Sequence, residues 1–472
     1  MNNNIRTAFT KTLLAVGIAS ASTLTQAASF QLIEQSASGQ GAAYAGAAAL
    51  GEDASTVYFN PAAMTRLSGQ QIVVAGHVIS PNAAFTNNGS TDALGTALTG
   101  PNSDTGDPAF VPNFYYTAEL ANELYVGVGV NVPFGLATEY DDGWVGRYHA
   151  LRSEITSINI NPSIAWKATD ALSVGIGISI QYLELELTNN IDSYGACVNL
   201  AANSQGAFTG ADCVDAGLAG FSVASQDSAV KLDGDSLEIG WNMGILYDVD
   251  DKNRIGVAYR SSIKHNVEGN ASYNLDPRLQ PFADGISAPP PDGSGFNVLQ
   301  NTTLEASAEL PESFSLSYVG EVNDKWTALF DWTWTGWSHL DVVTIRQQGG
   351  IPGQEATLDL EYKNTNRYSV GVNYQHTDKL IYRGGLALDQ TPIRSPETTS
   401  ARIPGNDRIW VSLGAGYAPS TSWSFDVAYS HLFIDDTEIN NFACASSCSG
   451  AALIGTYESS VDILSAQANF YF

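Results

Sequence analysis

One stretch of residues 237–249 decides the fold that we expect for this chain. It reads Leu237-Glu238-Ile239-Gly240-Trp241-Asn242-Met243-Gly244-Ile245-Leu246-Tyr247-Asp248-Val249. Every odd position is apolar, whereas glutamate, asparagine, aspartate and glycine stand among the even positions. Because successive side chains of a β-strand point to opposite faces, the segment predicts a strand with one apolar and one polar face.

The same alternation recurs along the chain, for example over residues 172–182, 326–334 and 464–472. It predicts fourteen strands, an even number. Their expected ranges are 70–79, 111–120, 123–134, 154–167, 171–187, 236–249, 253–268, 304–319, 325–346, 356–376, 379–389, 408–417, 421–432 and 459–472.

The connections between these strands alternate between short turns and long loops. An even strand number with short turns at one end and long loops at the other is typical of a bacterial outer-membrane barrel. Hydrocarbon offers no water to backbone groups, so a sheet that spans it must close on itself. We therefore predict an all-β fold, a fourteen-stranded antiparallel transmembrane β-barrel. A soluble sandwich or propeller is the alternative, but its strands are usually only about 5–6 residues long.

Composition restricts the class of partner. The 472 residues include 21 Lys plus Arg against 49 Asp plus Glu, for a formal net charge of −28. Such an acidic chain gains nothing from counterion release on a polyanion, so we expect no nucleic-acid partner. Aromatic residues make up 10% of the chain, which argues against a disordered protein.

Residues 1–27 have the composition of an export signal. Arg6 and Lys11 precede a short apolar stretch over residues 13–19, and Thr25-Gln26-Ala27 offers small residues at a cleavage site. A single anchoring helix is the alternative, but the apolar stretch is short for one. We expect a removed signal peptide and a location in the bacterial outer membrane.

The four cysteines lie in two local pairs, Cys197 with Cys213 and Cys444 with Cys448. Two disulfides suit an oxidising compartment. A metal site is the less favoured alternative because no histidine lies near either pair in the sequence.

Residues 28–69 do not continue the strand pattern. They are rich in Ala, Gly and Ser, with short helical candidates around Ala42–Leu50. A fourteen-stranded lumen is wide enough to leak if it is left open. We therefore predict a small, mostly helical plug (the hatch) over residues 28–69 and a barrel with long extracellular loops over residues 70–472; a disordered periplasmic leader is the alternative.

Several short motifs resemble the FadL family of outer-membrane long-chain fatty-acid transporters. Their order along the whole chain after residue 27, rather than any single motif, makes the resemblance specific. The motifs are Ala28-Ser29-Phe30-Gln31-Leu32, residues 38–46, Asp53-Ala54-Ser55-Thr56, Asn60-Pro61-Ala62, residues 135–140, Tyr259-Arg260-Ser261 with Lys264, and Ile403-Pro404 followed by Asp407-Arg408-Ile409-Trp410.

The resemblance implies a hatch-plugged barrel that binds hydrophobic substrate in an extracellular groove, transfers it to an inner pocket and releases it sideways through the wall. It also implies basic residues on the fifth strand and late in the ninth in members that bind a carboxylate. This chain departs from that pattern, with Glu184 and Glu186 on the fifth strand and only Arg346 near the end of the ninth. Alkanes or aromatic hydrocarbons are therefore an alternative cargo.

The third strand contains the candidate lateral exit, Pro133-Phe134-Gly135. Proline cannot donate to a ladder and glycine permits a kink, so the wall is expected to break there. The alternative is that Pro133 only ends the strand. On the fifth strand the apolar parity changes after Tyr182, which indicates either a bulge or emergence of the strand from the membrane.

Four candidate substrate-binding residues follow from the same reasoning. Parity turns Arg260 and Lys264 inward opposite lipid-facing Tyr259, and turns Arg367 inward opposite Tyr368. A guanidinium would hold a buried carboxylate well, although lumenal acids such as Asp331, Asp341 and Asp426 are alternative partners. Phe30 could line an apolar pocket.

Asn60, Pro61 and Ala62 form the candidate hatch motif. An Asn-Pro turn that shapes the plug is one reading, and a hydrogen-bonded tether to the wall is the other.

We therefore expect passive outer-membrane transport of hydrophobic molecules, with a long-chain fatty acid as the first candidate. A general porin and a lipid-modifying barrel enzyme are alternatives, and no enzyme motif in the sequence has suitable spacing. The expected partners are a fatty acid or other hydrophobic small molecule and outer-membrane lipid. We expect no cofactor, no metal and a monomer.

Overall fold

The computed structural model describes residues 29–92, 94–121, 123–204, 206–218, 220–287, 298–350, 355–442 and 450–472. The predicted signal peptide and the pair Cys444 and Cys448 lie outside these residues. Within them, no helix is both long enough and apolar enough to cross a membrane.

In the described parts of the chain, 21 strand segments form one antiparallel sheet, in which β1 pairs with both β3 and β21 and so closes the barrel. The segments group into the fourteen wall strands that the sequence predicts. They are β1 (Gln70–Asn87), β2 (Asp104–Thr105), β3 (Ala109–Ala121), β4 (Leu124–Asn131), β5 (Gly135–Glu139), β6 (Arg152–Lys167), β7 (Leu172–Ile191), β8 (Ser228–Asp248), β9 (Asn253–Arg260), β10 (Ile263–Asn274), β11 (Thr302–Leu310), β12 (Ser313–Asn323), β13 (Trp326–Thr335), β14 (Val342–Gln347), β15 (Ala356–Asp359), β16 (Thr365–Thr377), β17 (Leu380–Asp389), β18 (Arg408–Tyr417), β19 (Trp423–Ile434), β20 (Thr437–Phe442) and β21 (Ala452–Tyr471).

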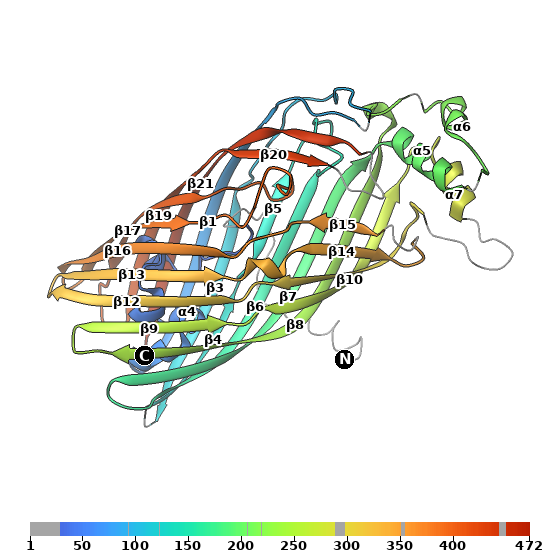
Figure 1. Ribbon diagram of the computed structural model, residues 1–472. Helices are drawn as coiled ribbons and strands as arrows, with labels where there is room; N and C mark the ends of the chain where they lie inside the picture. Colours follow the sequence, from blue (N-terminus) through green and yellow to red (C-terminus); the bar gives the residue numbers. More distant parts are fainter. Residues whose placement is uncertain are drawn as a thin grey trace.

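The two ends of the barrel differ as the sequence predicts. Short turns and the C-terminus lie at one end, and α5 (Ser193–Asn203), α6 (Gly210–Asp215) and α7 (Gln280–Ser287) lie together at the other (Figure 1). Of two single turns of 3₁₀ helix, η2 (Ala224–Gln226) lies in the loop before β8, and η3 (Trp337–His339) lies between β13 and β14.

The alternation of side chains is confirmed on the decisive strand. Along β8, Ile239, Trp241 and Tyr247 are exposed on the outer surface, whereas Asn242 and Leu246 are buried inside. The outer face is therefore apolar where lipid would contact it, and the polar positions line the lumen.

Several wall strands that the sequence predicts as continuous are broken. The expected strands 253–268, 304–319 and 325–346 are each interrupted, between β9 and β10, β11 and β12, and β13 and β14. At the first two breaks two residues, 261–262 and 311–312, leave the ladder, and the inner face changes from even to odd positions. At the third break residues 336–341 intervene, and the odd positions remain inside.

The fifth wall strand, in contrast, is not broken. β7 pairs with β8 without a register shift, from Leu172 opposite Tyr247 to Ile191 opposite Ser228. Leu183 and Leu187 are buried on its inner face, while Glu184 is exposed on the outer face. The parity change after Tyr182 therefore marks emergence from the membrane, since the polar side now faces outward.

The segment before β1 fills the lumen with short helices, which appear as the blue coils inside the barrel (Figure 1). These are α2 (Ala37–Gly41), α3 (Ala47–Leu50), α4 (Thr56–Phe59) and η1 (Pro61–Arg66).

This hatch is hydrogen-bonded to the last wall strand. The amide of Ala37 donates to Gln467 Oε1 at 2.9 Å, and Gln467 Nε2 donates to Asp53 at 2.9 Å. Gln40 Nε2 reaches the carbonyl of Ile463 at 3.1 Å. The plug is thus joined to the polar lumenal face of the barrel rather than only enclosed by it.

Candidate functional site

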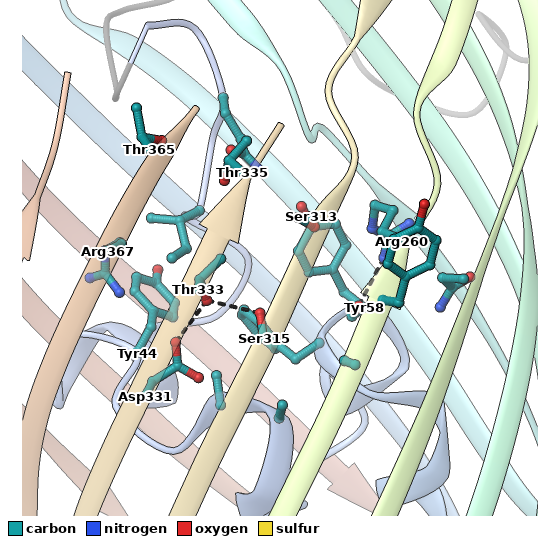
Figure 2. A pocket seen from close by; sticks show the side chains of 18 of the residues that line it. Tyr44, Tyr58, Arg260, Ser313, Ser315, Asp331, Thr333, Thr335, Thr365 and Arg367 are labelled. Carbon is teal, nitrogen blue, oxygen red and sulfur yellow. Dashed lines mark hydrogen bonds between the residues drawn. The ribbon is translucent and has the colours of Figure 1, made fainter. Parts of the chain in front are cut away.

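A cavity of about 90 Å³ lies between the hatch and the lumenal face of the wall. Its volume admits several water molecules, because one water needs about 10–15 Å³ of such space. Hatch residues Tyr44 and Tyr58 line it on one side, and wall strands from β8 to β18 line the other. Figure 2 shows Arg260 and Arg367 at opposite sides of this cavity, with Asp331, Thr333 and Ser315 between them.

Strand register explains why these side chains meet. Arg260 on β9 is the partner of Ser313 on β12, which pairs with Thr335 on β13. Two residues away along the strands, Thr333 on β13 is the partner of Arg367 on β16. Residues two apart share a face, so both rows point into the lumen.

Arg260 is held by the hatch and by a neighbouring strand. It donates to the carbonyl of Tyr58 at 2.8 Å and to Ser179 Oγ at 3.0 Å, and its guanidinium lies 4.4 Å from the centre of the Tyr58 ring. The aromatic face stabilises the cation without neutralising it.

Arg367 has a similar environment on the other side of the cavity. It donates to the carbonyl of Ala43 at 2.9 Å and to Ser369 Oγ at 3.4 Å, and its guanidinium lies 5.1 Å from the centre of the Trp410 ring. Its Nε is buried without a hydrogen-bond partner among the described residues. A guanidinium with a free donor beside a cavity is suited to an anion.

Two other lumenal arginines form ion pairs with carboxylates. Arg383 forms ion pairs with Glu52 of the hatch at 2.6 Å and Asp426 of the wall at 2.7 Å, and Arg254 pairs with Asp248 at 2.9 Å. In the described parts of the chain, neither Arg260 nor Arg367 has a carboxylate oxygen within ion-pair distance. We expected lumenal acids as alternative partners of the inward arginines. Asp426 is such a partner, but it pairs with Arg383 and not with Arg260 or Arg367.

Asp331 does not reach either cavity arginine. Its carboxylate accepts hydrogen bonds from Ser317 and, at 2.8 Å, from Thr333. Asp331 therefore forms no direct ion pair with Arg260 or Arg367.

The predicted inward position of Lys264 is wrong. Lys264 is exposed on the outer surface, and its neighbours Ile263 and His265 are buried. The interruption at Ser261 and Ser262 between β9 and β10 exchanges the two faces, so parity read from β9 cannot be extended to Lys264.

Phe30 is buried in an aromatic cluster. Its ring centre lies 5.3 Å from that of Trp337 and 5.8 Å from that of Phe134. Trp337 also lines the cavity, and the cluster continues into apolar side chains of the long-loop end such as Leu340 and Ile403. An apolar region therefore extends from the loops to the cavity.

The wall is interrupted at the predicted exit. β4 ends at Asn131 and β5 begins at Gly135, and β5 pairs only with β6. The neighbouring strand β3 pairs with β4 only from Phe114 onward. Its residues 109–113 pair with β1 on the other side and, among the described residues, have no strand partner on the side of the break.

Hatch backbone occupies this interruption instead of a wall strand. The amide of Leu32 donates to the carbonyl of Pro133 at 2.8 Å, and the amide of Gly135 donates to the carbonyl of Phe30 at 2.9 Å. The break is thus covered by a segment that is not part of the sheet.

Asn60 links the hatch to the wall. Its Nδ2 donates to the carbonyl of Ile245 on β8 at 3.1 Å and to that of Ala48 at 2.6 Å, while its Oδ1 accepts from Ala62 at 3.0 Å. Pro61 follows at the first position of η1, where proline costs no hydrogen bond. Both the turn and the tether are therefore present.

A disulfide joins Cys197 of α5 to Cys213 of α6 at the long-loop end, as predicted. Phe208 and Phe282 contact each other there, with ring centres 4.9 Å apart. Across the described ranges, no group of three or more His, Cys, Asp or Glu side chains is placed to hold a metal ion.

Several residues of this region escaped the sequence analysis. Tyr44, Tyr58 and Trp337 lie outside the wall strands, so strand parity does not place them. Arg408, in contrast, could have been found by parity, because Ile409 is exposed on the outer face of β18 while Arg408 is buried.

Comparisons with known proteins agree with this architecture. Over 444 residues the chain is 29% identical to the long-chain fatty acid transport protein of Escherichia coli (strain K12), covering 92% of this chain and 94% of that protein. Its structure is similar to the crystal structure of a Pseudomonas aeruginosa FadL homologue, with a TM-score of 0.84, 24% identity and coverage of 94% and 100%. It also resembles the Pseudomonas putida toluene transporter TodX, with a TM-score of 0.66, 17% identity and coverage of 94% and 99%.

The family model described as outer membrane protein transport protein (OMPP1/FadL/TodX) matches residues 18–472. This match covers the hatch, the wall strands and the loops described above. The chain therefore belongs to the OMPP1/FadL/TodX family of outer-membrane proteins that transport hydrophobic compounds.

Proposed function

We propose that this protein transports long-chain fatty acids passively across the outer membrane. A fatty acid has an alkyl chain and an anionic head, and each needs a different environment inside the barrel. The observation that carries the proposal is the pair of cavity cations, Arg260 and Arg367, which have no carboxylate partner among the described residues and lie beside an apolar cluster.

Partition supplies the driving force. Each methylene removed from water contributes roughly 0.8 kcal/mol, so a long alkyl chain gains several kcal/mol on reaching an apolar surface. Half-buried side chains at the long-loop end, such as Phe208 and Phe282, offer a first such surface. The cluster around Phe30 and Trp337 offers a second one next to the cavity.

Release is proposed to occur sideways, between β3 and β5. The backbone of Phe30 and Leu32 covers this interruption by hydrogen bonds to residues of the third wall strand. Breaking two such bonds costs about 1–3 kcal/mol in total, which is small against the gain of a long alkyl chain on entering the bilayer.

The first test is uptake of radiolabelled oleate by cells that lack their own transporter. Replacing both cavity cations, Arg260→Gln with Arg367→Gln, should reduce uptake by about 10- to 100-fold, since hydrogen bonds to charged groups contribute about 1.5–3 kcal/mol. Lys264→Gln is the matched control, because this cation lies on the outer surface. Equal loss in the control, or full uptake by the double variant, would contradict a carboxylate site.

Uptake of aromatic hydrocarbons is a second candidate function. The buried rings of Phe30, Phe134 and Trp337 favour it, because they contact one another close to the cavity. Toluene uptake should then be unaffected by the double arginine variant. Fast toluene uptake together with absent oleate uptake would replace the first proposal by the second.

A further inference from the structure

Three neighbouring wall strands carry a row of alternating charges that faces the hatch. Arg367 on β16 is the register partner of Asp389 on β17, which is in turn the partner of Arg408 on β18. All three side chains are buried. The row therefore contributes one net positive charge to the lumen.

The two arginines of this row are incompletely satisfied. Nε of Arg367 and both Nε and Nη1 of Arg408 are buried without a hydrogen-bond partner among the described residues. Leaving such donors unpaired is costly in a low-dielectric interior. The unpaired N–H groups of the two arginines are therefore suited to donate hydrogen bonds to an anion.

The hatch carries a carboxylate, Glu34, that interacts electrostatically with all three residues of this row. Glu34 is only 1% exposed, and its Oε2 also has no hydrogen-bond partner among the described residues. Its backbone carbonyl accepts a hydrogen bond from Asn113 Nδ2 at 2.8 Å. The next residue, Gln35, is held at the wall interruption because its side-chain Nε2 donates to the carbonyl of Val132 at 3.0 Å.

Charged and titratable groups face Glu34 from each element packed against it. Burial raises the pKa of Glu34 to about 7, Arg367 and Arg408 oppose this rise, and Asp389 adds to it. The hydroxyls of Tyr44 and Tyr58 in the hatch are further neighbours. The carboxyl can therefore change its protonation state near neutral pH at little cost.

We propose that Glu34 is the resident counter-charge of the Arg367–Arg408 pair, and that binding of a cargo carboxylate is coupled to protonation of Glu34. This inference rests on the proposed function. With Glu34 ionised, the two arginines and two carboxylates sum to zero charge. The carboxylate of the cargo would add a third negative charge that the two arginines do not balance, unless Glu34 takes up a proton from solvent and becomes neutral.

The coupling also gives head-group selectivity. A fatty acid brings the charge that replaces Glu34, whereas an alcohol or hydrocarbon of the same length brings none. An uncharged cargo therefore leaves Glu34 ionised and gains nothing from the arginine pair.

The test is calorimetric titration of the full-length protein in detergent at pH 7.5 with oleate and with oleyl alcohol. Repeating each titration in two buffers of different ionisation enthalpy measures proton uptake. We expect net uptake of about three quarters of a proton per bound oleate, because a carboxyl with a pKa of about 7 is ionised to that extent at pH 7.5, and no uptake with oleyl alcohol. Binding of oleate without proton uptake would overturn the inference and leave the proposed function intact; no oleate binding would overturn both.

A variant gives an independent readout. Glu34→Gln retains the size of the side chain but removes its charge, so at pH 7.5 it should bind oleate about fourfold tighter without proton uptake and bind oleyl alcohol unchanged. Glu52→Gln is the matched control, because this hatch carboxylate pairs with Arg383 in a different cluster. Equal oleate affinity in Glu34→Gln and the parent would overturn the inference. If Glu34→Gln does not assemble, the measurement of proton uptake by the parent protein alone tests the inference.

Discussion

At the residue scale, parity predicts an inward side chain only while the strand stays continuous. Arg260 and Arg367 could be placed in the lumen because half-buried Tyr259 and exposed Tyr368 fix the faces of their strands. Lys264 could not be placed, since two intervening residues leave the ladder and exchange the faces. Glu34 could not be predicted either, because its burial depends on the hatch being folded inside the barrel.

Asn60 supports a prediction at this scale. Asn60→Ala removes the amide that reaches the carbonyls of Ala48 and Ile245, and so leaves these acceptors without that donor. We expect the free energy of unfolding to fall by about 1–3 kcal/mol, measured as a lower thermal unfolding midpoint in detergent. Asn266→Ala on the outer face of β10 is the control and should leave the midpoint unchanged. Equal midpoints for Asn60→Ala and the parent would show that the tether contributes nothing.

At the element scale, the strong alternation predicts the strands better than their interruptions. The break after β9 is invisible in composition, because Ser261 and Ser262 are compatible with a strand. The break after β11 contains Pro311 and the break after β13 begins at Gly336, but the alternation on both sides outweighed these two signals. The break after β4 was predictable, since Pro133 cannot donate to the ladder and Gly135 follows it directly.

Pro133 gives the prediction for this element. Pro133→Ala restores a backbone donor and allows the third wall strand to regain ladder hydrogen bonds, so oleate uptake should fall several-fold while the barrel still assembles. Pro162→Ala is the matched control, because Pro162 lies in the continuous strand β6 on its exposed face. Unchanged uptake in Pro133→Ala would argue against this interruption as the exit.

At the scale of the whole molecule, closure by β1 and β21 and the apolar outer face could be predicted from strand number and alternation alone. The distribution of lumenal charges could not, because it depends on which hatch side chain meets which strand. Arg383, for example, is neutralised by Glu52 of the hatch as well as by Asp426 of the wall.

The hatch also determines what the barrel excludes. Liposomes that contain the intact protein should not swell in small sugars, because the helices fill the lumen. Deleting residues 29–66 should produce rapid swelling with the same sugars. Swelling with the intact protein would instead support a general porin, and its absence after the deletion would show that the loops alone close the barrel.

The seam between the first and last strands has a consequence for biogenesis. β1 and β21 are joined over seventeen consecutive residue pairs, from Gln71–Tyr471 to Asn87–Gly455, and β21 also carries Gln467, which holds Ala37 and Asp53. These contacts become available only when the end of the chain has arrived. We therefore expect the N-terminal helices to lack these hydrogen bonds until the final strand pairs with β1. Closure of the barrel and attachment of the helices inside it then occur in the same step of membrane insertion.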